Sequence, residues 1–262
     1  FNVTAEVETR DGRRGEGLGS IPMSNVWAWP SNVASADQTL AAMIALGQRL
    51  VEVSNDFADA GHPLEITHAL AAGHDSVAGE VVAQSNTPEA MPRLAQLVCA
   101  SPLEAAIHDA YGHALQANCY NLLSGEFVNS DLSHYLTADF VGEYLDQYTS
   151  RDPQPKMPLY HLVGALDPLF EEDIEHRVDD GLPETLGEWI IADGLTHLKI
   201  KLNGDDLDWD VERVARVEAA SVAAQSMRGC SAWHYSLDFN EKCENVQYIL
   251  NFLAKLREKS PS

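Results

Sequence analysis

Two pairs of polar residues in the second half of the chain have the types and spacing for acid–base chemistry. The first pair is Lys199 and Lys201 in "HLKIKL", and the second is Asp238 and Asn240 in "LDFN". Residues two apart on a strand point to the same face, so the members of each pair project together. A lysine beside a second ammonium group can have a lowered pKa and act as a base near neutral pH. A carboxylate at the end of a strand suits Mg²⁺, which takes oxygen ligands.

Each pair also has a simpler explanation. The lysines could lie in solvent on an edge strand, where their charge blocks unwanted strand pairing. Asp238 and Asn240 could cap a helix or form a turn. However, about 37 residues separate Lys201 from Asp238, which is the length of one βα unit, so both pairs are expected at the same edge of one sheet. A metal-bound carboxylate beside a lysine base can remove a proton α to a carboxylate.

Strands and helices alternate from about residue 155 onward, which predicts βα units and a parallel sheet. The pattern predicts three strands, each followed by a helix: strands at 157–166, 197–202 and 232–240, and helices at 184–193, 208–225 and 246–259. Three βα units are too few to close a barrel, which needs eight. The sequence therefore predicts either a small open sheet or part of a longer chain.

The first half of the chain has the pattern of an α+β domain. Alternating apolar and polar residues on both sides of "DG" predict a β-hairpin over 1–20. Helical periodicity then predicts helices over about 35–60, 63–84 and 87–118, the last with Pro88 in its first turn. The boundary between this domain and the α/β domain is expected near 125–156.

Two tryptophans stand between the hairpin and the first long helix, in "NVWAWP". Trp27 and Trp29 could line a substrate pocket, or they could anchor their loop to the core. The sequence favours neither role over the other.

Composition restricts the class of protein. The formal net charge of −23 argues against nucleic acid or an anionic membrane surface as a partner. No apolar run approaches the roughly 20 residues that a membrane-spanning helix needs. The four cysteines have no CxxC pair and are expected to be small core residues in a reducing compartment: Cys99, Cys119, Cys230 and Cys243. We therefore expect a cytoplasmic enzyme or binding protein.

Three stretches together resemble the mandelate racemase/muconate lactonizing enzyme branch of the enolase superfamily. "VETRDGRRGEGLG" (7–19) is similar to the hairpin of that family's capping domain. "ASPLEAAIHDAYGHALQANCYNLLSG" (100–125) is similar to its helix signature, and "LKIKLNGDD" followed by "LDFNE" resembles its Lys-x-Lys and Asp-x-Asn strand ends. The chain departs from the family pattern at His113 and Asn118, and in an acidic insertion over 170–187.

The resemblance implies a domain organisation. It implies an α+β capping domain over 1–125 that lacks its first strand, a linker over 126–156, and the first three βα units of a TIM-type barrel over 157–262. The expected fold class is therefore α/β with an α+β capping domain. The chain is expected to be an incomplete record of a longer protein, with the remaining metal ligands and the second acid/base outside this sequence.

The resemblance also implies roles for individual residues. Lys201 would be the general base, with Lys199 as its electrostatic neighbour and a contact of the substrate carboxylate. Asp238 would be the first of three carboxylate ligands to Mg²⁺, and Asn240 would lie close to the metal or the substrate. Capping-domain loops supply specificity in such enzymes, so Trp27 would belong to the substrate pocket, together with Trp29.

These roles lead to an expected activity. The enzyme would abstract the α-proton of a small carboxylate substrate to give a metal-stabilised enediolate. The outcome would be racemisation, epimerisation, cycloisomerisation or dehydration, and the dehydrations include that of an acid sugar. Such an enzyme, an isomerase or lyase, would be expected to form homo-oligomers. The alternative is a non-catalytic α/β protein that binds a ligand or partner, if the polypeptide truly ends at residue 262.

Overall fold

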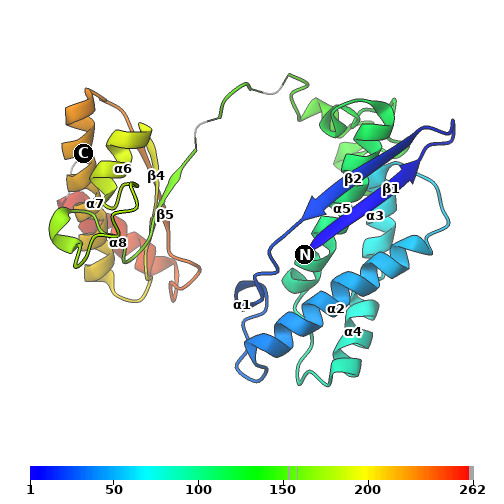
Figure 1. Ribbon diagram of the computed structural model, residues 1–262, viewed down its shortest axis with the longest axis horizontal. Helices are drawn as coiled ribbons and strands as arrows, with labels where there is room; N and C mark the ends of the chain where they lie inside the picture. The colour runs from blue at the N-terminus through cyan, green and yellow to red at the C-terminus, as the bar shows by residue number, and fades with distance from the viewer. Residues whose placement is uncertain (153, 158, 260–262) are drawn as a thin grey trace. The chain divides into compact units, whose positions relative to one another are not determined.

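The structure, a computed structural model, describes residues 1–152, 154–157 and 159–259 (Figure 1). The chain divides into two compact units, Phe1–Pro153 and Gln154–Ser262. The first unit combines one β-hairpin with helices, and the second combines a parallel sheet with helices. A mixed α/β fold is therefore confirmed. Among the helices in the described ranges, none is both long and apolar enough to cross a membrane.

The predicted hairpin is confirmed at the start of the first unit. β1 (Asn2–Glu8) pairs antiparallel with β2 (Arg14–Ser20), and the two strands are joined by a turn in which Gly12 has a φ of +83°. Glycine adopts this left-handed conformation without the steric cost that a β-carbon would add. The Asp-Gly signal in the sequence therefore identified the turn correctly.

Glycines on β2 bring the hairpin to backbone distance from α5 (Arg93–Leu115), along which the hairpin lies in Figure 1. A β-carbon on Gly17 would lie 2.1 Å from the backbone nitrogen of Ala110, and one on Gly19 would lie 1.8 Å from the carbonyl oxygen of Pro102. No side chain fits at these distances. The Asp109 carboxylate, on α5, also accepts a 2.9 Å hydrogen bond from the N–H of Leu18.

The helices of the first unit begin and end differently from the prediction. They are α1 (Asn25–Ala28), α2 (Ala36–Asn55), α3 (Pro63–Ala71), α4 (His74–Ser85) and α5. The single helix predicted over 63–84 is wrong, because the chain breaks at Gly73, a residue with poor helix propensity. Pro88 is not in the first turn of α5, which starts at Arg93. Pro92 is the N-cap of α5, and it disfavours a helical conformation in the residue before it, which favours a helix start after Pro92.

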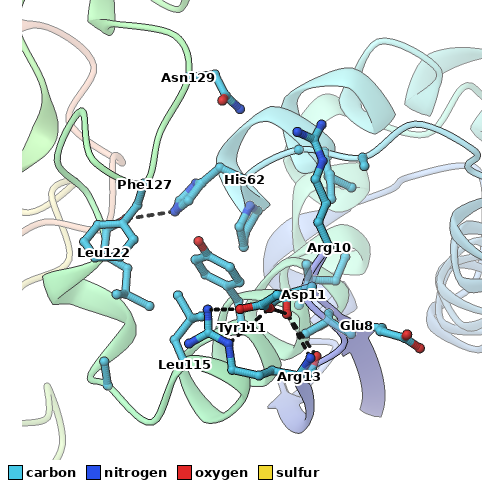
Figure 2. A pocket seen from close by; sticks show the side chains of 18 of the residues that line it. Glu8, Arg10, Asp11, Arg13, His62, Tyr111, Leu115, Leu122, Phe127 and Asn129 are labelled. Carbon is cyan, nitrogen blue, oxygen red and sulfur yellow. Dashed lines mark hydrogen bonds and ion pairs between the residues drawn. The ribbon is translucent and has the colours of Figure 1, made fainter.

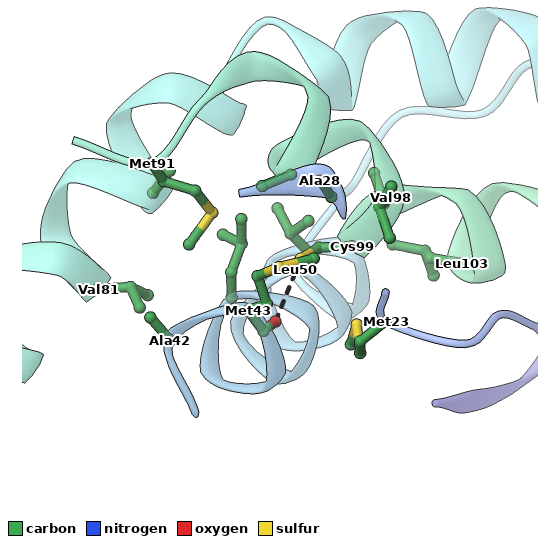
Figure 3. Close-up of a cluster of buried hydrophobic side chains, with 14 of the residues drawn as sticks. Met23, Ala28, Ala42, Met43, Leu50, Val81, Met91, Val98, Cys99 and Leu103 are labelled. Carbon is green, nitrogen blue, oxygen red and sulfur yellow. Dashed lines mark hydrogen bonds between the residues drawn. The ribbon is translucent and has the colours of Figure 1, made fainter. Parts of the chain in front are cut away.

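The core of the first unit lies where α2, α4 and α5 meet (Figure 3). Met43 and Leu46 of α2 are fully buried there, and the Cys99 thiol donates a 3.2 Å hydrogen bond to the Met43 carbonyl. Burial raises the pKa of Cys99 to about 12, so this thiol is an inert core group. The other three cysteines are free but only half-buried, which corrects the prediction that all four are core residues. Cys119 begins a short 3₁₀-helix after α5, and Cys230 and Cys243 lie in the loops after α7 (Leu207–Arg228) and before α8 (Val246–Lys259).

Residues 126–152, expected to be a linker, form turns and short 3₁₀-helices that belong to the first unit. These helices are η2 (Leu132–His134), η3 (Ala138–Phe140) and η4 (Leu145–Gln147), and η1 (Cys119–Asn121) precedes them. The carboxylate of Glu65 on α3 accepts hydrogen bonds from the backbone N–H groups of Asn129 and Ser130, at 2.9 and 3.0 Å. The start of the segment is thus attached to α3.

The second unit contains the predicted alternation of strands and helices. The strands are β3 (His161–Val163), β4 (His197–Lys201) and β5 (His234–Asp238), and the helices are α6 (Leu186–Asp193), α7 (Leu207–Arg228) and α8 (Val246–Lys259). The strands are parallel and lie in the order β3-β4-β5. A short 3₁₀-helix, η5 (Glu171–Asp173), lies in the acidic insertion. No closed barrel is formed by the described part of this unit.

The strand predicted over 157–166 is much shorter in the structure. Only His161–Val163 pairs with β4, and residue 158 lies outside the described residues. β3 is at the edge of the sheet as described, so the rest of the apolar stretch has no strand beside it that would extend the ladder. Apolar patterning alone does not provide such a partner.

One face of this sheet is buried and the other is more open. Leu198 and Ile200 of β4 pack in a core with Ile190 of α6, Val217 of α7 and Phe252 of α8. The intervening residues of β4 are only half-buried, as the alternation of a strand requires. The helices therefore cover the apolar face, and the polar residues of β4 project from the opposite face.

Candidate functional site

The two lysines lie on the central strand of the sheet, not on an edge. β4 has β3 on one side and β5 on the other. The side chains of Lys199 and Lys201 are 28% and 25% exposed, respectively. The explanation that these lysines protect an exposed edge strand from unwanted pairing does not fit this position.

Lys199 and Lys201 converge on one carboxylate. Lys201 and Asp238 are direct neighbours across the β4–β5 ladder, at the carboxyl ends of both strands. The Nζ of Lys201 lies 2.6 Å from Asp238 Oδ2, and the Nζ of Lys199 lies 2.9 Å from the same oxygen. Lys201 also donates to Asn240 Oδ1 at 2.6 Å. The structure thus brings together the four polar residues that the spacing placed at one edge of a sheet, and we call them the lysine–aspartate cluster.

Hydrogen bonds from the lysines determine the charge state of this cluster. They hold the pKa of Asp238 well below its usual range, with Lys201 as the larger contributor, so the carboxylate is ionised. The pKa of Lys199 is raised, mainly by its hydrogen bond to Asp238. Lys199 is therefore a fixed positive charge beside an ionised carboxylate.

Asn240 shows that the turn explanation and the site explanation are compatible. Its φ is +52°, a left-handed conformation that asparagine tolerates better than most residues. Its N–H donates a 2.9 Å hydrogen bond to Asp238 Oδ1, which closes a turn directly after β5. The same turn directs the amide oxygen of Asn240 to Lys201. Asp238 therefore shapes the backbone and also binds the lysines.

The cluster offers oxygen donors of the kind that Mg²⁺ prefers. Asp238 contributes a carboxylate and Asn240 an amide oxygen, both half-buried or exposed at the strand ends. Within the described ranges, no group of three or more His, Cys, Asp or Glu side chains is arranged to hold a metal ion. The oxygen donors of the cluster are thus of the type that fits Mg²⁺, and Asp238 is the one carboxylate ligand that the cluster could supply.

The two tryptophans have different surroundings. Trp29 is 1% exposed, and its indole N–H donates a 2.8 Å hydrogen bond to Glu89 Oε1. Burial leaves Trp29 no face for a ligand, so it has the anchoring role that the sequence left open. Trp27 is 61% exposed, and its place in a substrate pocket stays a prediction.

A cavity of about 680 Å³ in the first unit was not predicted from the sequence (Figure 2). It is lined by the hairpin turn, the start of α3, the end of α5 and the segment that follows α5. His62 and Tyr111 lie edge to face in it, with ring centroids 5.2 Å apart, and the Arg13–Asp11 ion pair lies beside them. Burial lowers the pKa of His62 to about 4, so its ring is neutral at pH 7. The cavity is formed by segments far apart in the chain, and a local pattern cannot reveal it.

Comparisons with known proteins identify no relative. The chain matches no protein-family model. It also matches none of the curated proteins and none of the solved structures with which it was compared.

Proposed function

We propose that the lysine–aspartate cluster is part of an active site that removes the α-proton of a carboxylate substrate with the help of Mg²⁺. One observation carries this proposal: Lys201 Nζ lies 2.6 Å from both Asp238 Oδ2 and Asn240 Oδ1, at the carboxyl ends of adjacent parallel strands. In open and closed parallel α/β folds, this end of the sheet carries the catalytic groups.

Each residue of the cluster has a role that follows from its contacts. Lys199 stays protonated beside Asp238, so it offers a fixed positive charge for the substrate carboxylate. Lys201 accepts the α-proton on the Nζ lone pair, so its ammonium group must first release one proton to solvent; the two N–H groups that remain can still donate to Asp238 and Asn240. Asp238 and Asn240 are the oxygen donors for the metal. Mg²⁺ bound there would supply positive charge where negative charge builds up on the substrate's carboxylate oxygens.

The resemblance to the enolase superfamily supports the same assignment. Enzymes of that superfamily use a lysine or histidine base together with one or two Mg²⁺ ions. We therefore propose that the first unit corresponds to a capping domain and that β3, β4 and β5 correspond to the first strands of a TIM-type barrel. The cluster itself does not distinguish racemisation or epimerisation from cycloisomerisation or dehydration, because all of them begin with the same proton transfer.

Solvent deuterium exchange tests the role of Lys201. The purified protein is incubated in D₂O with Mg²⁺ and a panel of carboxylic acids that carry an α-proton, and deuterium uptake is followed by ¹H NMR. Lys201→Ala should slow exchange about 10²- to 10⁴-fold, the usual contribution of a general base. Lys255→Ala is the matched control, because Lys255 ion-pairs with Asp208 in a different part of the same unit. Exchange at the wild-type rate in Lys201→Ala would contradict the proposal.

The cavity in the first unit favours a second candidate function, the binding of a small ligand without catalysis. Its volume is in the range of small-molecule sites, and apolar side chains such as Ile107, Leu115 and Phe127 form much of its lining. Ile107→Trp should fill the cavity and abolish binding of any ligand recovered by native mass spectrometry. Ligand binding without any α-proton exchange would favour this candidate over the enzyme.

A further inference from the structure

A second carboxylate near the lysine–aspartate cluster is completely buried. Asp210 lies in the first turns of α7 and is 0% exposed. A buried carboxylate is stable only when hydrogen bonds replace the water that it loses. Asp210 accepts three: from the N–H of Asn203 at 2.8 Å, from the N–H of Gly204 at 3.0 Å, and from the hydroxyl of Tyr248 at 2.6 Å.

These donors come from two different βα units. Asn203 and Gly204 form the loop that follows β4 and so lie two and three residues after Lys201. Tyr248 lies on α8, the helix that follows β5 and its Asp238–Asn240 turn. Asp210 therefore connects the segment that carries the proposed base to the segment that carries the proposed metal ligand.

Asp210 is not needed to cap its own helix. The N-cap of α7 is Asp206, whose side chain accepts the N–H of Trp209 at 3.0 Å. The loops that Asp210 joins are also in close contact, because a β-carbon on Gly204 would lie 3.1 Å from the backbone nitrogen of Cys243. Gly204 has a φ of +76°, so glycine suits both its conformation and its surroundings.

We propose that Asp210 and Tyr248 are positioning residues for Lys201. The pair fixes the loop after β4 against the helix after β5, and so sets the distance and direction between Lys201 Nζ and the oxygens of Asp238 and Asn240. Their side chains bond to the loop after β4 and to each other, not to Lys201, Asp238 or Asn240. This inference rests on the proposed function of the cluster, but the geometry that it assigns can be measured without a substrate.

NMR of the lysine side chains measures this geometry directly. The chain has only six lysines, so the correlations between Cε and Nζ should give six resolvable signals, and that of Lys201 is assigned from its loss in Lys201→Ala. Tyr248→Phe removes one hydroxyl and keeps the ring. It should shift the Lys201 signal, because the loop that follows Lys201 is no longer held. Asp210→Asn should shift it further, because the loop N–H groups then lose part of their acceptor.

Tyr235→Phe is the matched control. It also removes a phenol–carboxylate hydrogen bond in the same unit, between Tyr235 and Glu218, but on the helix-covered side of β5. It should lower the thermal stability of the unit and leave the Lys201 signal in place. A purely structural role for Tyr248 predicts the same behaviour for Tyr248→Phe, and an unchanged Lys201 signal in that variant would overturn the inference.

Kinetics separate this inference from the proposed function. If the wild-type protein exchanges α-protons, Tyr248→Phe should lower kcat by about 10- to 100-fold, as loss of a supporting contact does, with little change in KM. If the wild-type protein exchanges none, the proposed function fails, but the NMR comparison still decides whether Asp210 and Tyr248 position Lys201. Catalysis together with an unchanged kcat and Lys201 signal in Tyr248→Phe would overturn the positioning role alone.

Discussion

β2 and β4 follow the same alternation but use it for opposite purposes. On β2 the buried face consists of glycines, and the space that they leave is filled by the backbone of α5. On β4 the buried face consists of bulky aliphatic residues, and the other face carries Lys199 and Lys201. A strand can thus be held in place by close backbone contact at its glycines, as on β2, or by the packing of bulky side chains, as on β4. Both strands leave a second face for polar residues, but only on β4 do these residues converge on one carboxylate.

The largest expected effect tests the packing of β2. Gly17→Ala should destabilise the first unit by about 3 kcal/mol, because the added carbon would have to push the hairpin away from α5. Hydrogen exchange followed by mass spectrometry would locate the loss of protection in β1 and β2. Gly79→Ala is the matched control: its β-carbon has open space on α4, so the change should stabilise by about 0.5–1 kcal/mol. Equal stability of Gly17→Ala and the wild type would contradict the close packing.

A smaller effect is the loss of stability of the first unit in acid, which depends on His62. The folded-state pKa of His62 is lowered from 6.5 to about 4, mainly by burial. Between these values the unfolded chain binds a proton that the folded unit does not, so stability is full above pH 6.5 and falls as the pH drops towards 4. The first unit should therefore lose about 2–3 kcal/mol of unfolding free energy over this window. Chemical denaturation at pH 7, 6 and 5 measures this loss.

His62→Gln is the variant that checks the cause. It should be less stable than the wild type at pH 7, since His62 bonds both the Leu122 carbonyl and the Leu64 N–H. It should also show a weaker dependence on pH. Some dependence should persist, because burial lowers the pKa values of His74 and His108 in the same direction. An unchanged slope in His62→Gln would assign the acid sensitivity to other groups.

The smallest effect concerns the second unit. Asp238 has a lowered pKa, so its stabilising contribution is present above its ordinary value near 4 and is lost as the pH falls towards the lowered one. Asp238→Asn should cost about 1–2 kcal/mol at pH 7, where it leaves two lysines without their acceptor. The variant should then lose less stability than the wild type between pH 4 and 2. A parallel loss in both proteins would exclude Asp238 as the acid-sensitive group.

The features that the sequence predicted correctly depend on short patterns within a single strand or turn. The Asp-Gly turn defined the hairpin, and the alternation of β4 put Lys199 and Lys201 on one face. Residues two apart on a strand share a face, and 37 residues is the length of one βα unit. These two facts predicted that Asp238 and Lys201 lie at the same edge of one sheet, and the structure has them side by side. Each of these inferences needs only the geometry of a strand and the direction of its neighbour.

The features that the sequence missed depend on contacts between distant segments. The short β3 reflects the lack of a second neighbouring strand in the described unit, and the burial of Trp29 reflects its bond to Glu89, 60 residues away. The raised pKa of Lys199 depends on its 2.9 Å contact with Asp238, a residue of another βα unit. Asp210 appeared in the sequence as one acid among 40, and only its three donors distinguish it.

The glycine face of β2 also sets an order of events during folding. A two-stranded hairpin is at best marginally stable alone, and the face of β2 that packs on α5 has no side chains with which to form an apolar cluster of its own. Its complement is the row of alanines on α5 at positions 106, 110 and 114, and the Leu18–Asp109 bond spans 91 residues of chain. During synthesis the hairpin is therefore made before α5 but becomes stable only after α5 has emerged, so β1 and β2 are secured later than their place ahead of α5 suggests.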